Sequence, residues 1–212
     1  SPGGVLVELH TERIVPFTRR ATAAVRWHLR LPEESAQVVL VSSIISRVKA
    51  DEATADPRTG TSLTRNALTK PKTDLTEEIA VLGHLTRSTR FRVVCAMAHR
   101  LETESQHVQT QERQANDLRH RFVFNAQAGQ TITLTKFLAY ETARHSRRVK
   151  LAALAKRAVR NAREVGFSGL KREQAEYLTE FWTHADIRID GAEDIQESIR
   201  FNLFHVLQAA GR

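Results

Sequence analysis

The 212-residue sequence predicts an α+β protein, mainly an antiparallel β-sandwich that is followed by helices. Three observations predict this fold class. Apolar and polar residues alternate from Val5 to about Ala143, as in strands that turn one face to a core. A long polar stretch interrupts this alternation. After Ala143 the apolar residues recur every three or four positions, which is typical of helices.

Six segments carry the strand pattern. They are VLVELHTERIV, ATAAVRWHLRL, QVVLVSSIIS, FRVVCAMAHRL, HRFVFNAQA and QTITLTKFLAY. In the second, the apolar residues from Val25 to Leu31 alternate with the basic residues from Arg26 to Arg30. Turn-forming residues such as Ala128-Gly129-Gln130 separate several of the segments. We therefore expect residues 1–143 to form a sandwich domain whose strands are antiparallel.

A polar stretch over residues 47–78 predicts a long loop inside this domain. It contains Pro57, Gly60 and Pro71 and shows no sustained period. A connection of this length is usually either functional or without fixed structure. The sequence leaves open whether the loop is disordered or reaches toward a partner surface.

Residues 144–186 predict a helical linker. Its first helix has an apolar stripe made of Leu151, Ala155, Ala158, Ala162 and Val165. Gly166 is the expected stop, because glycine readily adopts the backbone conformation that ends helices. A second helix is expected from about Leu170 to His184, and a short extended piece, DIRID, follows it.

The last segment, residues 187–212, predicts a strongly apolar helix. Asp190 and Glu193 form a D-x-x-E pattern similar to a capping box, and Gly211 stands where a C-terminal cap is expected. The residues expected to be buried are Ile195, Ile199, Asn202 or Leu203, Val206 and Ala210, with Phe204 and Leu207 at the sides. The helices of this chain are too few to cover that surface. We therefore expect the helix to open a larger helical domain that lies outside this sequence.

Composition limits the class of protein. The net charge is +8, and the densest basic stretch runs from Arg144 to Arg163, which favours an acidic partner domain or a solvated helix face over nucleic acid. Cys95 is the single cysteine, which excludes an internal disulfide and a multi-cysteine metal site. No apolar run is long enough to cross a bilayer, and SPGGVLVELH lacks the features of a secretory signal. A cytoplasmic location is expected.

No catalytic pattern is present in the sequence. The nine histidines form neither H-x-H nor H-E-x-x-H, so no metal site is predicted. There is no G-x-S-x-G elbow, phosphate-binding loop or dinucleotide glycine pattern. Adjacent carboxylates such as Glu33-Glu34 and Glu77-Glu78 are typical of solvated turns. Cys95 lies in an apolar strand and is expected to be a buried small hydrophobe. We predict no catalytic residue, no metal and no cofactor.

Several strings resemble one enzyme family, glycoside hydrolase family 65. These strings are ELHTERIVPFTRRATAAVRWHLRL, LTKFLAYETAR, REVGFSGLKREQAEYLTEFWTHADIRIDG and QESIRFNLFHVLQA. The resemblance implies part of a galactose-mutarotase-like super-sandwich, a helical linker, and the first helix of an (α/α)6 barrel that begins at residue 187. One departure is Gly191-Ala192, where the family commonly has Gly-Asp.

The resemblance also implies a function. Family members, such as maltose, trehalose and kojibiose phosphorylases, cleave an α-glucosidic disaccharide with inversion, using inorganic phosphate as co-substrate or water instead. The catalytic glutamate would lie beyond residue 212, in the remainder of the barrel. This portion would then be structural, and the complete enzyme a homodimer. Trp182 and His205 are the candidates nearest the sugar, although each also fits a core position.

Two further functions stay open. A free carbohydrate-binding module would need an exposed aromatic platform, and the sequence has only two Trp and two Tyr. A nucleic-acid-binding domain would use the basic helix of residues 144–163, and its affinity would fall steeply with added salt.

Overall fold

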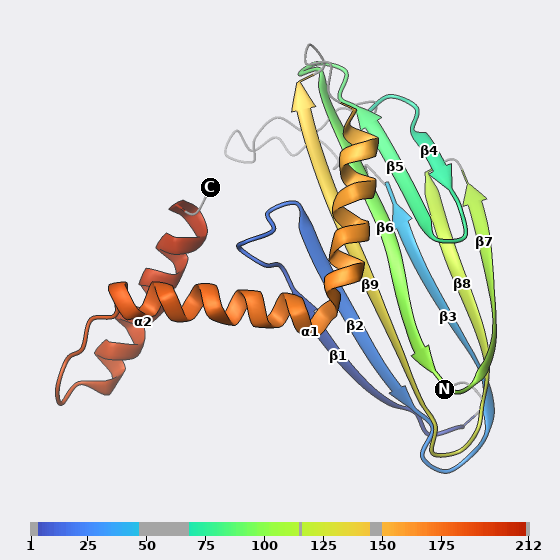
Figure 1. Cartoon of the computed structure of the whole chain (residues 1–212), viewed down its shortest axis with the longest axis horizontal. Helices are drawn as coiled ribbons and strands as arrows, with labels where there is room; N and C mark the ends of the chain where they lie inside the picture. Colours follow the sequence, from blue (N-terminus) through green and yellow to red (C-terminus); the bar gives the residue numbers. More distant parts are fainter. Residues whose placement is uncertain (1–3, 47–67, 115, 145–149, 211–212) are drawn as a thin grey trace, which may run out of the picture.

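The computed structural model describes residues 4–46, 68–114, 116–144 and 150–210, where strands are followed by two helices (Figure 1). The elements are β1 (Glu8–Ile14), β2 (Thr22–Arg30), β3 (Ala36–Ile45), β4 (Lys72–Leu75), β5 (Ile79–Leu85), β6 (Phe91–Thr103), β7 (Gln106–Gln114), β8 (Asp117–Ala126), β9 (Thr131–Arg144), α1 (Leu151–Ala185) and α2 (Glu193–Ala210). In this described part, no helix is long and apolar enough to cross a membrane.

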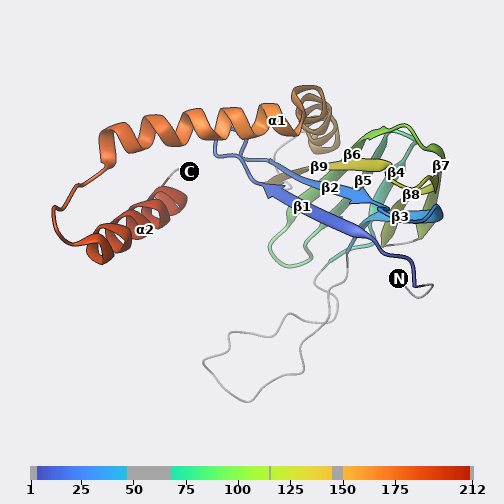
Figure 2. The same ribbon diagram turned by 90° about the horizontal axis from the view of Figure 1, so that it is seen from below.

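The strands form two sheets, which confirms the predicted sandwich. The larger has the order β1-β2-β9-β6-β5-β4 and the smaller the order β3-β8-β7. All pairs of neighbouring strands in these sheets are antiparallel. Figure 2 shows the resulting layers, with α1 on one side of the larger sheet and β3, β7 and β8 on the other.

Aromatic and long aliphatic side chains fill the space between the sheets. Leu29 of β2 and Leu134 of β9 pack with Phe122 and Phe124 of β8, and all four side chains are buried. The alternation of β2 predicted this inward face correctly, since Leu31 is also fully buried in the same cluster. Burying one such side chain stabilises a fold by about 1.5–3 kcal/mol.

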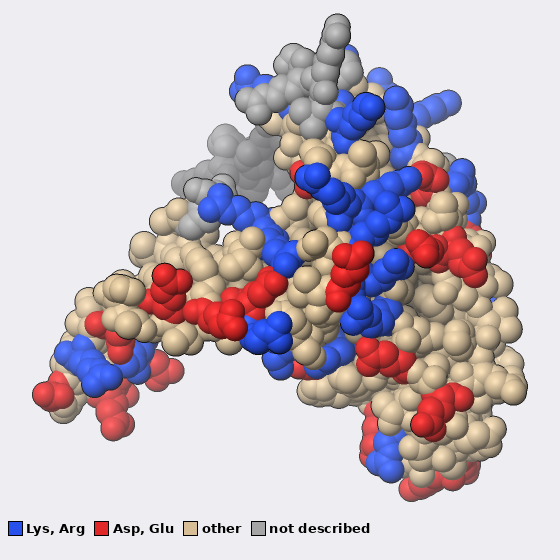
Figure 3. All heavy atoms as spheres, viewed as in Figure 1, with Lys and Arg blue, Asp and Glu red and all other residues tan. Residues whose placement is uncertain are grey.

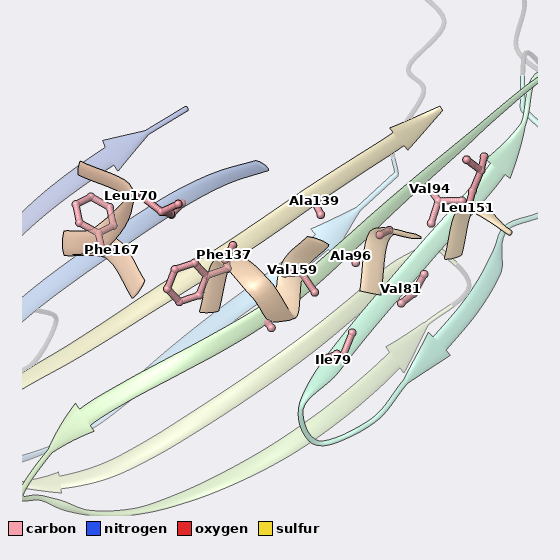
Figure 4. Close-up of a cluster of buried hydrophobic side chains, with 14 residues drawn as sticks. Ile79, Val81, Val94, Ala96, Phe137, Ala139, Leu151, Val159, Phe167 and Leu170 are labelled. Atoms are coloured by element: carbon pink, nitrogen blue, oxygen red, sulfur yellow. The ribbon is translucent and has the colours of Figure 1, made fainter. Parts of the chain in front are cut away.

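The first half of α1 covers the outer face of the larger sheet. Val159 and Leu151 point at the strands, with Leu151 next to Val94 (Figure 4). Much of this contact is made by small residues, among them Ala155 on the helix and Ala96 on β6, both fully buried. Small side chains let the helix backbone approach the sheet closely. Consequently β5 and β6 are covered on both faces.

The predicted loop over residues 47–78 is wrong in its second part. Residues 47–67 lie outside the described residues, but Leu68 forms a bridge with Thr86, and β4 pairs with β5. The strand KTDL is short and polar because it forms the edge of the sheet, so its four residues give no clear period. The strands β5 and β7 were also not predicted.

Gly166 interrupts α1, as predicted. Its φ of 75° and ψ of 168° are not helical, and the second half of the helix leaves the sheet at this point (Figure 2). Arg100 of β6 donates to the carbonyl oxygens of Arg163 and Glu164, which end the first half. The predicted start of the second half at Leu170 is wrong, because helical geometry resumes at Phe167.

One expectation for α2 is also wrong. The helix starts at Glu193, and the Ala192 carbonyl accepts its first backbone hydrogen bond, so Asp190 is not the cap. No described residue of α2 is buried. Ile195 is 54% exposed and Val206 is 61% exposed, as expected, because the helices of this chain are too few to cover α2. The predicted C-terminal cap, Gly211, lies outside the described residues.

Candidate functional site

The connection between β1 and β2 contacts both helices. The Phe17 ring stacks on Tyr177 of α1 at 5.4 Å between ring centroids, and its edge meets Phe204 of α2 at 6.2 Å. The Phe17 backbone N–H donates to Oε1 of Gln174 over 2.9 Å. Phe17 thus lies between the second half of α1 and the middle of α2. We call this contact region the joint; it consists of Phe17, Arg19, Glu173, Gln174, Tyr177 and Phe204.

An arginine in the joint holds both halves of α1. The Arg19 guanidinium donates to both oxygens of Glu173, over 2.7 and 2.8 Å, and also to the side chain of Asn161. This pair lowers the pKa of Glu173 and raises that of Arg19, because each hydrogen bond favours the charged forms. Asn161 precedes the break at Gly166 and Glu173 follows it. Arg19 therefore fixes the angle between the two halves.

A second contact holds the region just after the break. Glu12 of β1 accepts from Arg26 of β2 and from Lys171 of α1, and these bonds lower its pKa to about 2. The Arg26 guanidinium lies 4.3 Å from the centroid of the Phe167 ring. Arg26, on the basic side of β2, therefore packs against the start of the second half of α1.

The link between α1 and α2 has its own contacts. The Gln196 side chain accepts from the Ile189 N–H over 2.8 Å and donates to the Ile187 carbonyl. Arg200 donates to both oxygens of Asp186, which lowers the pKa of that carboxyl. Gln196 rather than Asp190 thus organises the start of α2.

The two predicted sugar-site residues lie in different elements. Trp182 is half-buried on α1, and its ring meets the edge of Phe181 at 4.9 Å. His205 is exposed on α2, with Phe201 at 4.3 Å and Phe204 at 6.3 Å. Among the described residues, no ring contact joins Trp182 to His205. His205 is next to the joint through Phe204.

The described residues contain no cluster of three or more His, Cys, Asp or Glu that could hold a metal ion. Cys95 is buried, as predicted, and burial raises the pKa of its thiol to about 11, which keeps it protonated. The contacts of the joint thus position the second half of α1 and α2. The sequence analysis did not identify Phe17 and Arg19 as site residues, because their hydrogen-bond partners are more than 140 residues away in the sequence. The one sequence feature that marks this position is the apolar string Val-Pro-Phe within an otherwise polar turn.

Comparison with known proteins identifies the family of this chain. An uncharacterized glycosyl hydrolase of Mycobacterium tuberculosis (strain ATCC 25618 / H37Rv) is 31% identical over 212 residues, which are 100% of this chain and 27% of that protein. An alpha,alpha-trehalose phosphorylase of Thermoanaerobacter brockii is 29% identical over the same shares of both chains. The chain thus spans 27% of the length of these relatives.

A solved structure from the human microbiome, named as a kojibiose phosphorylase, superposes with a TM-score of 0.79. The match covers 96% of this chain and 25% of that one at 15% identity, so it shows the shared fold. The family model described as glycosyl hydrolase family 65, N-terminal domain, matches residues 1–181. The chain therefore belongs to glycosyl hydrolase family 65, and the sandwich with α1 corresponds to the N-terminal domain of that family.

Proposed function

We propose that this chain is the supporting portion of an enzyme that cleaves an α-glucosidic disaccharide by inverting phosphorolysis. The proposal rests on the family and on the names of relatives, which include trehalose and maltose phosphorylases. In this proposal the sandwich and α1 form a rigid base. The joint sets the direction of the second half of α1 and of α2, on which a barrel of helices is built. The domain boundaries predicted from the sequence, 143/144 and 186/187, belong to this proposal.

The observation that carries the proposal is the surface of α2. Ile195, Phe201 and Val206 are each more than half exposed, and no residue of the helix is buried. An apolar helix of 18 residues normally buries one face against neighbours. We assign the exposed apolar surface of α2 to contacts with the remainder of the catalytic barrel. The catalytic glutamate would lie in that remainder, and none of the residues described above has this role.

Inversion requires the acid and the attacking group to lie on opposite sides of the sugar. The acid protonates the leaving oxygen while phosphate attacks the anomeric carbon from the other face. Phosphorolysis of an α-disaccharide would therefore release β-glucose 1-phosphate. If water attacked instead, the product would be β-glucose. Phosphate would be a co-substrate rather than a resident cofactor.

An activity assay tests this assignment. The purified 212-residue chain is incubated with trehalose, maltose or kojibiose plus inorganic phosphate, and proton NMR follows the anomeric signals. We expect no turnover from the chain alone. From the protein made from the whole reading frame that contains it, we expect β-glucose 1-phosphate with one of these sugars. Turnover by the chain alone, or an α-phosphate product, would contradict the proposal.

The carbohydrate-binding alternative gains little support. The exposed large aromatic residues described are Phe91, Tyr140 and Phe201, which belong to three different elements. Trp27 and Trp182 are both half-buried. These rings offer no shared platform on which a sugar could stack, and titration calorimetry with glucans is expected to show no binding.

The nucleic-acid alternative is weakened by ion pairs on the basic helix. Lys156 pairs with Asp74 and Arg163 with Glu78, so part of the charge of α1 is used to hold the β4–β5 hairpin. Homodimer formation and a cytoplasmic location stay predictions from the resemblance and the composition.

A further inference from the structure

A cavity lies between the start of α1 and the β4 edge of the larger sheet. Its volume is about 520 Å³, which falls within the range of small-molecule sites. Val81, Leu85, Val94 and Leu151 contribute apolar walls. Gly83, which also lines the cavity, lets the Val94 side chain approach β5 closely, because a Cβ at this position would lie only 3.3 Å from it.

The same cavity is lined by basic residues from separate elements. Lys70 precedes β4, Lys72 lies on β4, Arg92 on β6, and Lys150 directly before α1. Within the described residues, Lys70, Lys72 and Lys150 have no carboxylate within 4.0 Å. Figure 3 shows Lys and Arg gathered at this end of the molecule, over the start of α1 and the neighbouring strands.

Two acidic residues of the β4–β5 hairpin already have partners. Asp74 accepts from Lys156, and its pKa is lowered by that hydrogen bond. Glu78 pairs with Arg163 at 3.9 Å. The lysines that line the cavity thus present a positive charge that no described side chain neutralises.

The start of α1 adds to this positive field. The first turn has no acidic residue, and no side chain of the described residues caps the helix. The N-terminal end of a helix carries a partial positive charge, which carboxylates and phosphates normally compensate. Leu151 and Ala152 of that turn both line the cavity. A cavity with apolar walls, three lysines without a carboxylate partner among the described residues, and a helix start is complementary to an anion with an apolar body.

We propose that this cavity binds a small organic anion, in which a compact apolar group carries a phosphate or a carboxylate. The apolar group lies on Val81, Val94 and Leu151, and the anion lies between Lys72, Lys150 and the first turn of α1. This site belongs to the sandwich and α1 alone. The proposal is therefore independent of the disaccharide reaction and can be tested on the 212-residue chain.

The test is a titration followed by two-dimensional ¹H–¹⁵N NMR. The probe is 1-naphthyl phosphate, with 1-naphthol as its uncharged counterpart and inorganic phosphate as the anion without an apolar body. We expect saturable shifts at the amides of Gly83, Leu85, Val94 and Leu151 with 1-naphthyl phosphate. Each of the other two compounds should bind at least about tenfold more weakly, because each lacks one of the two contacts.

A pair of variants tests the role of charge. Lys72→Gln together with Lys150→Gln should weaken binding of 1-naphthyl phosphate by about tenfold. Both lysines are exposed, so the fold does not depend on them. Arg160→Gln, which removes an exposed charge elsewhere on α1, should change the affinity by less than about twofold. Absence of saturable shifts, equal binding of 1-naphthol, shifts centred on α2, or an unchanged affinity in the lysine variant would each overturn the proposal.

Discussion

Gly166 shows how one residue determines the course of α1. Its φ of 75° lies in the left-handed region, and a Cβ at this position would be 2.6 Å from Nη1 of Arg100. That guanidinium ends the first half of the helix by binding the Arg163 carbonyl. Glycine is therefore required twice, by the backbone conformation and by the close approach of Arg100.

We predict that Gly166→Ala lowers the free energy of unfolding by about 2–3 kcal/mol, because backbone strain and displacement of Arg100 add together. Urea unfolding followed by far-UV circular dichroism measures this loss. Gly191→Ala is the matched control, since Gly191 has a φ of 78° and a Cβ at this position would meet nothing within 4 Å. This control should cost about 1–2 kcal/mol, which is the backbone cost alone and less than the loss in Gly166→Ala. Equal losses in the two variants would contradict the role given to Arg100.

Two histidines between the sheets, the buried His120 and the partly buried His99, have one consistent arrangement of protons. Nε2 of His120 donates to the Thr76 carbonyl, so Nδ1 of the neutral ring must accept. His99 then donates from Nδ1 to His120 over 3.1 Å and accepts at Nε2 from Ser42 over 2.8 Å. Burial lowers the pKa of both rings, and the nearby Lys136 ammonium acts in the same direction. Both imidazoles are therefore neutral in the fold.

This arrangement predicts a loss of stability in mild acid. The unfolded chain takes up protons near pH 6.5, whereas folded His99 stays neutral to a much lower pH. Stability is thus complete above pH 6.5 and falls as the pH drops, by about 2 kcal/mol at pH 5 for one ring that stays neutral. Denaturant unfolding between pH 7.5 and 5 measures the slope. His99→Gln should flatten it, and His205→Gln, on an exposed ring, should not.

The sequence predicted the role of single residues correctly where that role depends on the local sequence and not on contacts with distant residues. Gly166 was recognised as a break and Cys95 as buried, because each followed from its own local string. Asp190 was predicted to cap the last helix. In the structure, the hydrogen bonds of Gln196 with Ile187 and Ile189 determine where α2 begins. Trp182 and His205 were predicted from resemblance, and their role at a sugar stays a prediction.

At the scale of elements, strand prediction depended on which face is covered. β2 was predicted because its inward side is apolar and its outer side basic. β5 was not predicted because α1 and the smaller sheet bury both of its faces, so its sequence lacks the alternation of apolar and polar residues. β7, QHVQTQERQ, was not predicted for the opposite reason: it is an exposed edge strand made almost wholly of polar residues.

The joint is the element-scale contact that the sequence could not show. We predict that Phe17→Ala frees the second half of α1 and α2, because the ring is the contact that both helices share. Hydrogen exchange measured by mass spectrometry should become several-fold faster in residues 171–185 and 193–210. Residues 151–165 should be unchanged, since their packing on the sheet does not involve Phe17.

The control for this variant is Val15→Ala in the same connection. Val15 is 71% exposed and should leave the exchange of both helices as in the native chain. If Phe17→Ala also left exchange unchanged, the joint would not hold the helices. If exchange rose equally in residues 151–165, the variant would have loosened the whole fold instead.

At the scale of the whole molecule, the chain has a well-covered part and a sparsely covered part. The two sheets and the first half of α1 enclose three apolar clusters. The second half of α1 extends away from the sheets, and α2 lies in the same outlying part of the molecule with its apolar residues largely exposed (Figures 1 and 2). The sequence predicted this division from the excess of apolar residues in the last helix, but it could not show which contacts orient that helix.

The most direct test of this account is amide hydrogen exchange in the 212-residue chain. If α2 presents an uncovered contact face, its amides should exchange at least about a hundredfold faster than those around Ala155 and Val159, which are fully buried against the sheet. Protection of residues 195–206 equal to that of residues 155–162 would contradict the account, because it would mean that the chain covers α2 by itself.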